Sequence, residues 1–318
     1  MLTIYYTKLY LTMTGNELKM KGLLSHWNIG KVQLLEHRKN IKKITSEGST
    51  FYLKERKGTS YWERKEEYRI TQYLIRKGIN VETPILNICG EPYVKEDGSY
   101  YSLYASLEGN PIQVNKENCC GQFIMLGKYL ARFHLALGKC PYEYSTQVWD
   151  VFNYFKSWLS ESKSELTEWA EKVYGEISSY EGTYKWLPLQ LVHSDAHLRN
   201  VLWMGDKILG LVDFERIRQA PRIGDLAYII ASLLRYSGST IDFHHFLRNI
   251  RELIKGYTFN LGISDEEAVL LPHLVILILL QYTMYYSQQG YVKAAVFHKK
   301  CIDYLMRCKD YFEATTCH

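Results

Sequence analysis

In the first hundred residues, apolar side chains occur in short runs separated by turn residues, which is typical of β-strands. The β-prone runs lie at residues 31–36, 41–45, 49–54, 92–94 and 100–107. Glu47-Gly48 and Asp97-Gly98 separate successive runs, and such dipeptides favour the tight turns of β-hairpins. The pattern therefore predicts an antiparallel sheet in the N-terminal part of the chain.

A helical period interrupts and then replaces this pattern. Residues 62–76 place Ile70 and Leu74 on one face and end just before Gly78, as expected of a helix. After residue 115 the apolar residues recur at helical spacing, beginning with Phe123, Leu126, Leu130, Phe133 and Leu137. One part of this helical region is an exception, because it contains β-prone runs at residues 189–192, 201–204 and 208–212. We therefore expect a mostly helical second part that contains a small β-element.

The length of the chain bears on its domain organisation. At 318 residues it exceeds the roughly 250–300 residues at which a single hydrophobic core stops growing. We expect an α+β fold with two lobes, in which residues 1–107 form an antiparallel sheet with a helix. Residues 108–112 would be the hinge, and residues 113–318 the mostly helical second lobe. A ligand is expected in the cleft between such lobes.

Composition narrows the class of protein. The chain has 39 Lys and Arg against 34 Asp and Glu, a net charge of +5, and the basic residues are spread along it, so we expect no nucleic-acid partner. Seven cysteines without a Cys-x-x-Cys pair, and an N-terminus without a signal-peptide pattern, favour a reduced, cytoplasmic protein. The most apolar run, residues 268–280, is shorter than the about 20 residues of a membrane span. It predicts a core helix, and no membrane partner is expected.

Polar residues gather in the β-element of the second part. Asp195 and Asn200 occupy the loop between two short strands, and Asp213 ends the strand of the next hairpin. Three oxygen ligands can therefore converge on one point. Phosphoryl transfer requires such a set, because a carboxylate accepts the proton of the attacking hydroxyl and hard oxygen ligands hold the magnesium that bridges the nucleotide phosphates.

The order His193-x-Asp195-x-His197-x-x-Asn200, followed by a hairpin that ends in Asp213, resembles the catalytic motif of the aminoglycoside phosphotransferase and choline kinase family. Its members are small-molecule relatives of the protein kinases, and kinase-like spore-coat proteins resemble the same family. The resemblance implies a protein-kinase-like fold and the cofactors ATP and Mg2+. In such a fold, residues 1–107 would be the nucleotide-binding lobe, and residues 113–318 the lobe for catalysis and acceptor binding. It implies Asp195 as the catalytic base and Asn200 and Asp213 as magnesium ligands. His193 and His197 would organise the loop.

Two further segments resemble this family. Residues 224–227, Gly-Asp-Leu-Ala, resemble the helix start that follows the metal loop, where Asp225 would cap the helix and brace the catalytic loop. Residues 126–134 resemble a helix that packs beneath that loop. We interpret His134 on this helix as a core or loop-bracing histidine and not as a catalyst.

A kinase-like site also requires a strand lysine for the nucleotide phosphates and a glutamate on the following helix to position it. Lys54 ends the predicted strand 49–54, and Glu67 lies on the helical face of Leu74. Glu66 is the alternative, because the helix phase is defined only to about one residue. The predicted features follow one another in the order found in a kinase: the lysine, the glutamate, the hinge, the catalytic loop and the metal loop.

The resemblance implies further nucleotide contacts in the N-terminal lobe. The phosphate loop would be residues 37–40, where Arg38 and Asn40 stand in a turn without the glycines of protein kinases. Tyr52 lies two residues before the lysine on the same strand face, where it would stack on the adenine or crowd it. Ala105 and Leu107, at the end of the last strand, complete the predicted nucleotide contacts.

Two other functions stay open. The spacing of His193, Asp195 and His197 also suits zinc in a metal-dependent hydrolase, although that function leaves Asn200 and Asp213 without roles. The other alternative is a non-catalytic kinase-like assembly protein of the spore-coat type. The tyrosine before the strand lysine favours it, and the retained magnesium ligands weigh against it.

The predicted reaction is ATP-dependent phosphorylation of a hydroxyl group of a small molecule. Its acceptor is open among aminoglycosides, amino alcohols, homoserine and sugars, and the sequence predicts no particular oligomeric state. A cationic aminoglycoside requires an acidic pocket. The acidic residues of the C-terminal region, most of them expected on the solvated surface, are Asp265, Glu266, Glu267, Asp303, Asp310 and Glu313.

Overall fold

The computed structural model describes residues 15–38, 40–113, 121–142, 148–161, 166–236 and 242–316. Contacts between residues divide the chain into two compact units. Unit 1 contains the residues up to Tyr68 together with Thr83–Ser106, and unit 2 contains Arg69–Glu82 and the residues from Leu107 onward. The contacts thus assign the segment Arg69–Glu82, which includes the end of the predicted helix, to unit 2. The predicted hinge at residues 108–112 stays a prediction.

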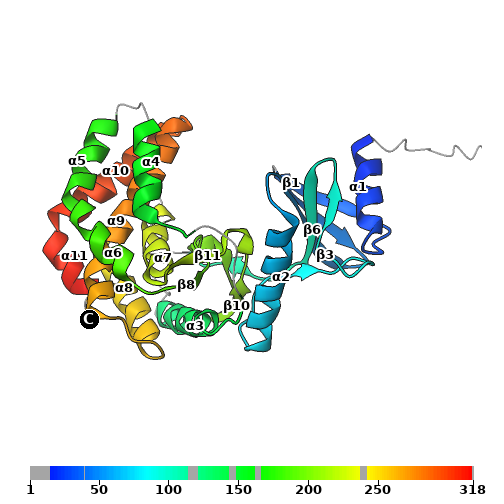
Figure 1. The fold of residues 1–318 in the computed structure, drawn as a ribbon, viewed down its shortest axis with the longest axis horizontal. Coiled ribbons are helices and arrows are strands. Elements are labelled where there is room, and N and C mark those ends of the chain that lie inside the picture. The colour runs from blue at the N-terminus through cyan, green and yellow to red at the C-terminus, as the bar shows by residue number, and fades with distance from the viewer. Residues whose placement is uncertain are drawn as a thin grey trace, which may run out of the picture. The chain divides into compact units, whose positions relative to one another are not determined.

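Unit 1 is built on an antiparallel sheet (Figure 1). Its elements are α1 (Gly15–Ser25), β1 (Gln33–Arg38), β2 (Ile41–Ser46), β3 (Ser49–Arg56), the first part of α2 (Tyr61–Arg76), β4 (Pro84–Ile85), β5 (Val94–Glu96) and β6 (Ser99–Ala105). The strands pair in the order β1-β2-β3-β6-β4, and β5 also pairs with β6. Glu47-Gly48 and Asp97-Gly98 have positive φ angles and form the two predicted hairpin turns. The predicted N-terminal antiparallel sheet is confirmed.

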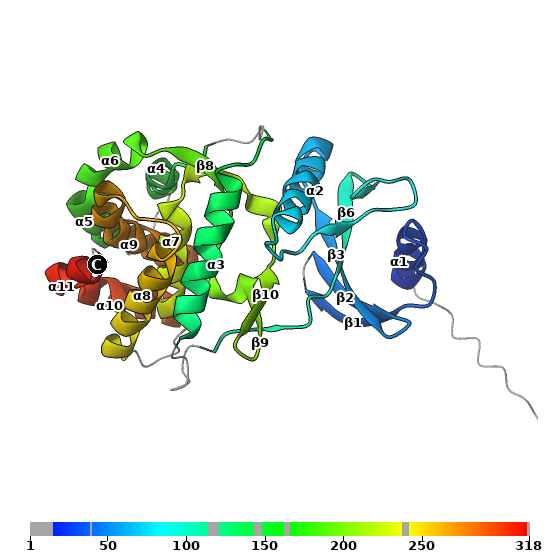
Figure 2. The ribbon, with the colours of Figure 1, turned by 90° about the horizontal axis from the view of Figure 1, so that it is seen from below.

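The two faces of this sheet have different neighbours, with α1 on one side and α2 on the other (Figures 1 and 2). Leu53 of β3 lies opposite Leu103 of β6, and both belong to a buried apolar cluster with Leu24 of α1. Because successive side chains of a strand alternate between faces, Lys54 and its partner Ser102 are directed to the other face. This alternation places the predicted lysine on the side of α2.

Unit 2 combines helices with two small antiparallel sheets. Its strands are β7 (Asn110–Pro111), β8 (Leu189–Val192), β9 (Val201–Met204), β10 (Lys207–Leu211) and β11 (Arg218–Pro221). Its helices after α2 are α3 (Gln122–Leu137), α4 (Val151–Glu161), α5 (Thr167–Ile177), α6 (Glu181–Trp186), α7 (Ile223–Arg235), α8 (Phe243–Thr258), α9 (Asp265–Gln288), α10 (Val292–Arg307) and α11 (Lys309–Thr316). One sheet has the order β10-β9-β7, and the other pairs β11 with β8. The predicted mostly helical second part with a small β-element is confirmed.

Helices α3 and α8 lie side by side in unit 2 (Figure 2). A Cβ atom added at Gly127 of α3 or at Gly256 of α8 would clash with the backbone of the other helix. Only glycine permits so close an approach of two backbones. The close crossing brings the ring of His134 on α3 within 2.8 Å of the Tyr257 hydroxyl on α8.

The long helix α9 contains the predicted core helix of residues 268–280. It begins with a capping box, in which Ser264 and Glu267 each accept a hydrogen bond from the backbone N–H of the other. By length and composition α9 could cross a membrane, but 72% of its most apolar 18-residue window is buried inside the structure. Such burial is typical of the central helix of a folded core.

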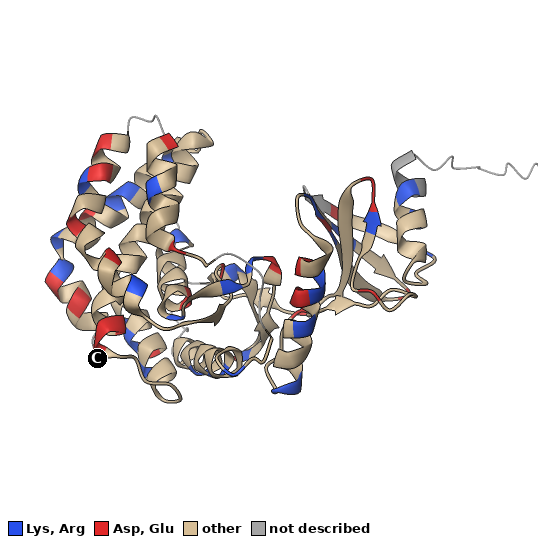
Figure 3. Ribbon diagram, viewed as in Figure 1, with Lys and Arg blue, Asp and Glu red and all other residues tan. Residues whose placement is uncertain are grey.

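Acidic and basic residues are interspersed along the elements of each unit (Figure 3). Glu181 of α6, for example, lies 2.8 Å from Lys156 of α4 and 2.6 Å from Lys185. On α10, Lys299 lies 2.7 Å from Asp303. Half-exposed pairs of this kind contribute little to stability, so we attribute the fold mainly to the buried apolar clusters.

Candidate catalytic site

The predicted catalytic residues lie on the segment between β8 and β9. After β8 the chain passes through His193 and Asp195 and then forms a short 3-10 helix, Leu198–Asn200, that leads into β9. Ser194 has a φ of 57°, a left-handed conformation that a residue with a side chain adopts only when its surroundings hold it there. Asp225 of α7 provides this hold, because its carboxylate accepts hydrogen bonds from the backbone N–H groups of His193 and Ser194, each at 2.8 Å.

A buried chain of side chains supports Asp225. Its carboxylate is fully buried, and Oδ2 lies 3.2 Å from Nε2 of His134 on α3. The other ring nitrogen of His134 lies 2.8 Å from the hydroxyl of Tyr257 on α8. Burial raises the pKa of Tyr257 above its ordinary value, so the hydroxyl stays protonated. The conformation of the catalytic loop therefore depends on α3, α7 and α8.

The structure corrects the expectation that Asp225 caps its helix. The N-cap residue of α7 is Arg222, whose side chain makes no capping hydrogen bond. The two oxygens of Asp225 accept the N–H groups of the loop instead. Asp225 is therefore a loop-bracing residue and not a helix cap, because its carboxylate binds the loop that follows β8 and not the first turn of α7.

The ring of His193 is held by the protein on both sides. Because a carbonyl only accepts, Nε2–H donates to Val212 O at 3.0 Å, and Nδ1 then accepts the Asp195 N–H at 3.3 Å. The ring is fully buried, with Phe214 at 4.8 Å between ring centroids. Neither nitrogen of the His193 ring is therefore left to bind a zinc ion. Among the described residues no group of three His, Cys, Asp or Glu side chains could hold a metal, so the hydrolase alternative has no structural support.

Asn200 and Asp213 are brought close to one another by the backbone of this region. Nδ2 of Asn200 donates to the Asp195 carbonyl at 3.0 Å, so its Oδ1 is the atom that can ligate a cation. The Val212 N–H donates to the Asn200 carbonyl at 2.9 Å and ties the loop to the turn after β10. Asp213 follows in the left-handed region, with φ 69° and ψ 60°. An amide oxygen and a carboxylate are hard ligands that suit Mg2+.

Glu82 supports this turn, and the sequence analysis missed it. Its Oε2 accepts a hydrogen bond from the backbone N–H of Asp213 at 3.0 Å, and its own N–H donates to the Leu211 carbonyl at 2.8 Å. Val81 forms a parallel bridge with Leu211, so the segment beside β10 comes from 131 residues earlier in the chain. No local pattern marks Glu82, because its role depends on a pairing between distant segments.

If Asp213 ligates Mg2+ in a phosphotransferase, as the sequence predicts, we expect Glu82→Ala to raise the Mg2+ concentration needed for half-maximal activity by about 10- to 100-fold, because the turn that carries Asp213 loses its support. Glu82→Gln keeps an acceptor oxygen and should stay within about 3-fold of the wild-type value. The measurement is the rate of phosphoryl transfer as a function of Mg2+ concentration. An unchanged Mg2+ dependence in Glu82→Ala would contradict this supporting role.

In unit 1, the predicted lysine and glutamate converge on one tyrosine. Lys54 is 5% exposed, and its Nζ lies 4.5 Å from the ring centroid of Tyr104. The Tyr104 hydroxyl donates to Oε1 of Glu67 at 2.7 Å, and Arg64 donates to Oε2 at 2.7 Å. Glu67 is buried, whereas Glu66 is half-buried. Glu67, one of the two glutamates considered from the sequence, therefore shares the neighbour Tyr104 with Lys54.

Tyr52 lies on the same face of β3 as Lys54. It pairs across the sheet with Tyr104 of β6, and Nζ of Lys43 lies 5.8 Å from its ring centroid. Its side chain is half-buried. An aromatic ring therefore stands two residues before the strand lysine, and its contact with an adenine stays a prediction.

The other predicted nucleotide contacts stay predictions as well. Arg38 ends β1, and Asn40 is exposed in the turn before β2, whereas residue 39 and the side chains of residues 37 and 38 lie outside the described residues. Ala105 ends β6 and is exposed. Leu107 belongs to unit 2 and is half-buried.

Aromatic side chains surround the Asp195 carboxylate, and the sequence analysis missed these as well. Burial raises the pKa of Tyr228 well above its ordinary value, and the neighbouring Tyr282 and the charge of Asp195 add to this shift. Burial lowers the pKa of His197 to about 4, so its ring is neutral near pH 7. This ring lies 6.4 Å from the ring of Tyr228 and 5.9 Å from that of Tyr236. No short motif relates these tyrosines, which stand on α7, directly after it, and on α9.

Comparison with known proteins identifies the family of the chain. Residues 36–250 match the phosphotransferase enzyme family. Homoserine kinases of Beijerinckia indica subsp. indica and Mesorhizobium japonicum are each 26% identical to this chain, over 272 and 271 residues. The matches cover 81% and 80% of this chain and 81% of each relative.

Solved structures share the fold. A microcompartment-associated aminopropanol kinase has a TM-score of 0.74 at 15% identity, over 93% of this chain and 98% of that chain. An amicoumacin kinase in complex with AMP-PNP and Ca2+ has a TM-score of 0.72 at 21% identity, over 90% and 92% of the two chains. An aminoglycoside phosphotransferase from Alicyclobacillus acidocaldarius has a TM-score of 0.62 at 16% identity, over 91% and 96%. These likenesses confirm the predicted fold class.

Proposed function

Because the chain belongs to the phosphotransferase enzyme family, we propose that it transfers the γ-phosphoryl group of ATP, with Mg2+, to a hydroxyl group of a small molecule. The membership confirms the family and the small-molecule kinase class that the motif predicted. The observation that carries the finer proposal is the braced loop. Asp225 fixes the backbone before Asp195, and the Asn200 amide bonds to the Asp195 carbonyl.

In the proposed reaction the acceptor oxygen attacks the γ-phosphorus, the bond from this phosphorus to the β,γ-bridging oxygen breaks, and ADP leaves. Asp195 accepts the proton of the attacking hydroxyl. Asn200 and Asp213 would hold the Mg2+, which neutralises charge on the phosphates when bound. Lys54 would steady the α- and β-phosphates. These roles rest on the placement of each residue and on the order of the motif.

The relatives guide the choice of acceptor. Two curated relatives are named homoserine kinases, and one structural relative is named an aminopropanol kinase. Homoserine and aminopropanol are both small alcohols that carry an amine. We therefore propose a small alcohol of this size range as the first acceptor to test.

The deciding experiment is a calorimetric titration of the full chain with ATP, with and without Mg2+. We expect Mg2+-dependent binding, and we expect Asp213→Ala to weaken it by on the order of 100-fold because a metal ligand is lost. Asp206→Ala is the matched control, because Asp206 is exposed at the tip of the same hairpin.

Each outcome of the titration bears on the proposal. Equal binding by Asp213→Ala and wild type would remove Asp213 from the metal site. If neither ATP nor GTP binds to the wild-type protein, the proposed kinase is wrong and the non-catalytic assembly protein becomes the better assignment. The half-buried Tyr52 beside Lys54 is the feature that would then explain the loss of nucleotide binding.

A further inference from the structure

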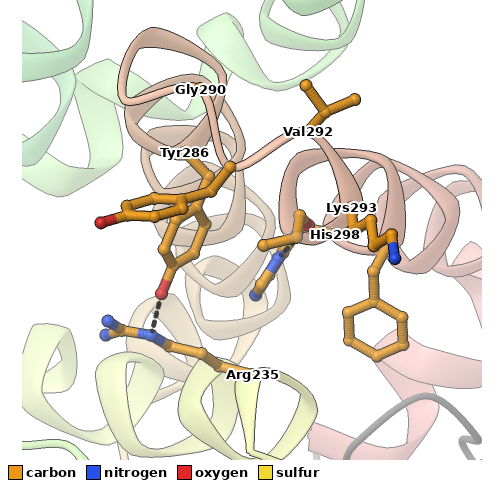
Figure 4. A pocket seen from close by; sticks show the side chains of 9 residues that line it. Arg235, Tyr286, Gly290, Val292, Lys293 and His298 are labelled. Carbon is orange, nitrogen blue, oxygen red and sulfur yellow. Dashed lines mark hydrogen bonds between the residues drawn. The ribbon is translucent and has the colours of Figure 1, made fainter.

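A pocket of about 780 Å³ lies in unit 2 at the end of α7 and the junction of α9 and α10 (Figure 4). Its wall includes Arg235 of α7, Tyr286 of α9, and Lys293 and His298 of α10. The other lining residues are Gly290, Tyr291, Val292, Ala294 and Phe297. The pocket is therefore largely aromatic and apolar, with cationic side chains and no acidic one among its lining residues.

Arg235 is the best-positioned charge in this pocket. Its Nε donates to the Tyr286 hydroxyl at 2.9 Å, a contact that Figure 4 shows, and its guanidinium lies 4.2 Å from the ring centroid of Tyr282 and 5.1 Å from that of Tyr236. Burial alone would lower the pKa of Arg235, but the neighbouring tyrosines hold this pKa above its ordinary value. The guanidinium therefore stays charged. The hydrogen bond fixes the plane of the guanidinium and leaves its two Nη groups for a partner.

The charge of Arg235 has no counterion in the described part of the chain, where its side-chain contacts are with tyrosines and none is with a carboxylate. A half-buried cation beside a cavity favours an anionic ligand, because the ligand restores the solvation that burial removed. The acidic residues considered for an aminoglycoside site do not line this pocket. Glu267, for instance, pairs with Arg222, and Asp303 pairs with Lys299.

Aromatic side chains lie between Arg235 and the catalytic loop. Tyr282, which carries the guanidinium of Arg235 on its face, lies 5.8 Å from the ring of Tyr228. The Asp195 carboxylate adds to the raised pKa of both tyrosines, after their burial. Nε2 of His298, which lines the pocket, is buried without a hydrogen-bond partner among the described residues. Buried polar atoms are normally satisfied, so this nitrogen is a candidate for contact with a polar group of a ligand.

Building on the kinase function proposed above, we propose that this pocket binds the acceptor and that Arg235 pairs with a carboxylate of that acceptor. The substrate class is then a hydroxy acid, an alcohol that also carries a carboxylate, and not a polycationic aminoglycoside. Arg235 acts as a specificity-determining residue, with Lys293 adding positive charge at the exposed edge of the pocket. In the proposed complex the hydroxyl of the acceptor is directed toward Asp195, on the side of the pocket where Arg235 contacts Tyr282 and Tyr282 contacts Tyr228.

The test uses pairs of alcohols that differ only by a carboxylate: homoserine with 3-aminopropan-1-ol, threonine with 1-aminopropan-2-ol, and tyrosine with tyramine. Kanamycin serves as the polycationic acceptor. Binding of each probe to the full chain is measured by calorimetry without nucleotide, and phosphoryl transfer is measured separately with ATP and Mg2+. The variants are Arg235→Met and Arg235→Lys. Arg251→Met is the control, because Arg251 also contacts a tyrosine, Tyr311, but lies outside the pocket.

We expect at least one carboxylate to bind and to exceed its decarboxylated partner in kcat/KM by on the order of 100-fold. Arg235→Met should remove that preference by raising the acceptor KM, with the KM for ATP unchanged, whereas Arg251→Met should behave as wild type. Arg235→Lys, which keeps the charge, should restore part of the preference and shows that a loss in Arg235→Met is not caused by misfolding.

Three results would overturn the inference: preference for the amino alcohols or kanamycin, carboxylate binding that Arg235→Met retains, or no binding by any carboxylate of the set. The failure of the kinase function itself looks different. In that case ATP does not bind, but a carboxylate still binds to wild type and not to Arg235→Met.

Discussion

Asp195→Asn is expected to lower kcat by about 10³- to 10⁴-fold, because the variant keeps the shape of the side chain and loses the base that accepts the hydroxyl proton. ATP affinity should change little, since Asn200 and Asp213 carry the metal in the proposed site. The backbone of the loop should also be unchanged, because it is held by the Asp225 carboxylate and by the amide of Asn200. The measurement is steady-state kinetics alongside the ATP titration.

The matched control for this variant is Asp206→Asn. Asp206 is an exposed aspartate at the turn between β9 and β10, and its described contact is with the side chain of Gln122. It should leave kcat at the wild-type value. Turnover of Asp195→Asn within about 10-fold of wild type would exclude Asp195 as the base, since general-base catalysis contributes more than that.

Some of this fold could be predicted because its causes are local. Asp97 and Gly98 adopt positive φ angles that these residue types tolerate, so the hairpin was visible as a dipeptide between two β-prone runs. Glu67 shares the buried face of α2 with Ile70 and Leu74, as the 3.6-residue period requires. The catalytic loop was recognisable for the same reason, because its residues are close together in the sequence.

The supports of the site could not be predicted, because they join segments that are distant along the chain. Glu82 meets the Asp213 N–H across 131 residues, and His134 meets Asp225 across 91 residues. Arg235 obtains its partner Tyr286 from another helix, 51 residues later. No period or spacing in one sequence encodes such pairings, which follow from how the helices pack.

Strand β11 and helix α1 are among the elements that the sequence analysis missed, and the reasons differ. Strand β11, which pairs with β8, ends in Pro221 and has no alternating pattern, and its register is defined by the partner strand. Helix α1 contains Gly15 and Gly22, which lower its intrinsic helix propensity. It is stabilised by packing, since Leu23 and Leu24 are buried against the sheet of unit 1.

The second large effect is a loss of stability, which we expect from the substitution Asp225→Ala. The fully buried carboxylate accepts two loop N–H groups and lies next to the His134 ring, so its removal leaves buried donors unsatisfied. We expect the free energy of unfolding to fall by about 3–5 kcal/mol. Thermal melting of the full chain should show a fall in Tm of roughly 10 °C.

Asp150→Ala is the control, because it also removes an aspartate that accepts hydrogen bonds from two backbone N–H groups. The comparison separates the stability lost at Asp225 from this more general effect. Asp150 also accepts two, from Phe152 and Asn153 at 3.0 Å each, but it is half-buried at the start of α4, so its loss should cost only about 1 kcal/mol. If Asp225→Ala melts no lower than Asp150→Ala, Asp225 does not hold the loop. The hydrogen bond from Leu198 N–H to the Ser232 hydroxyl would then be the stronger brace, and the left-handed Ser194 would owe its conformation to the 3-10 turn and not to α7.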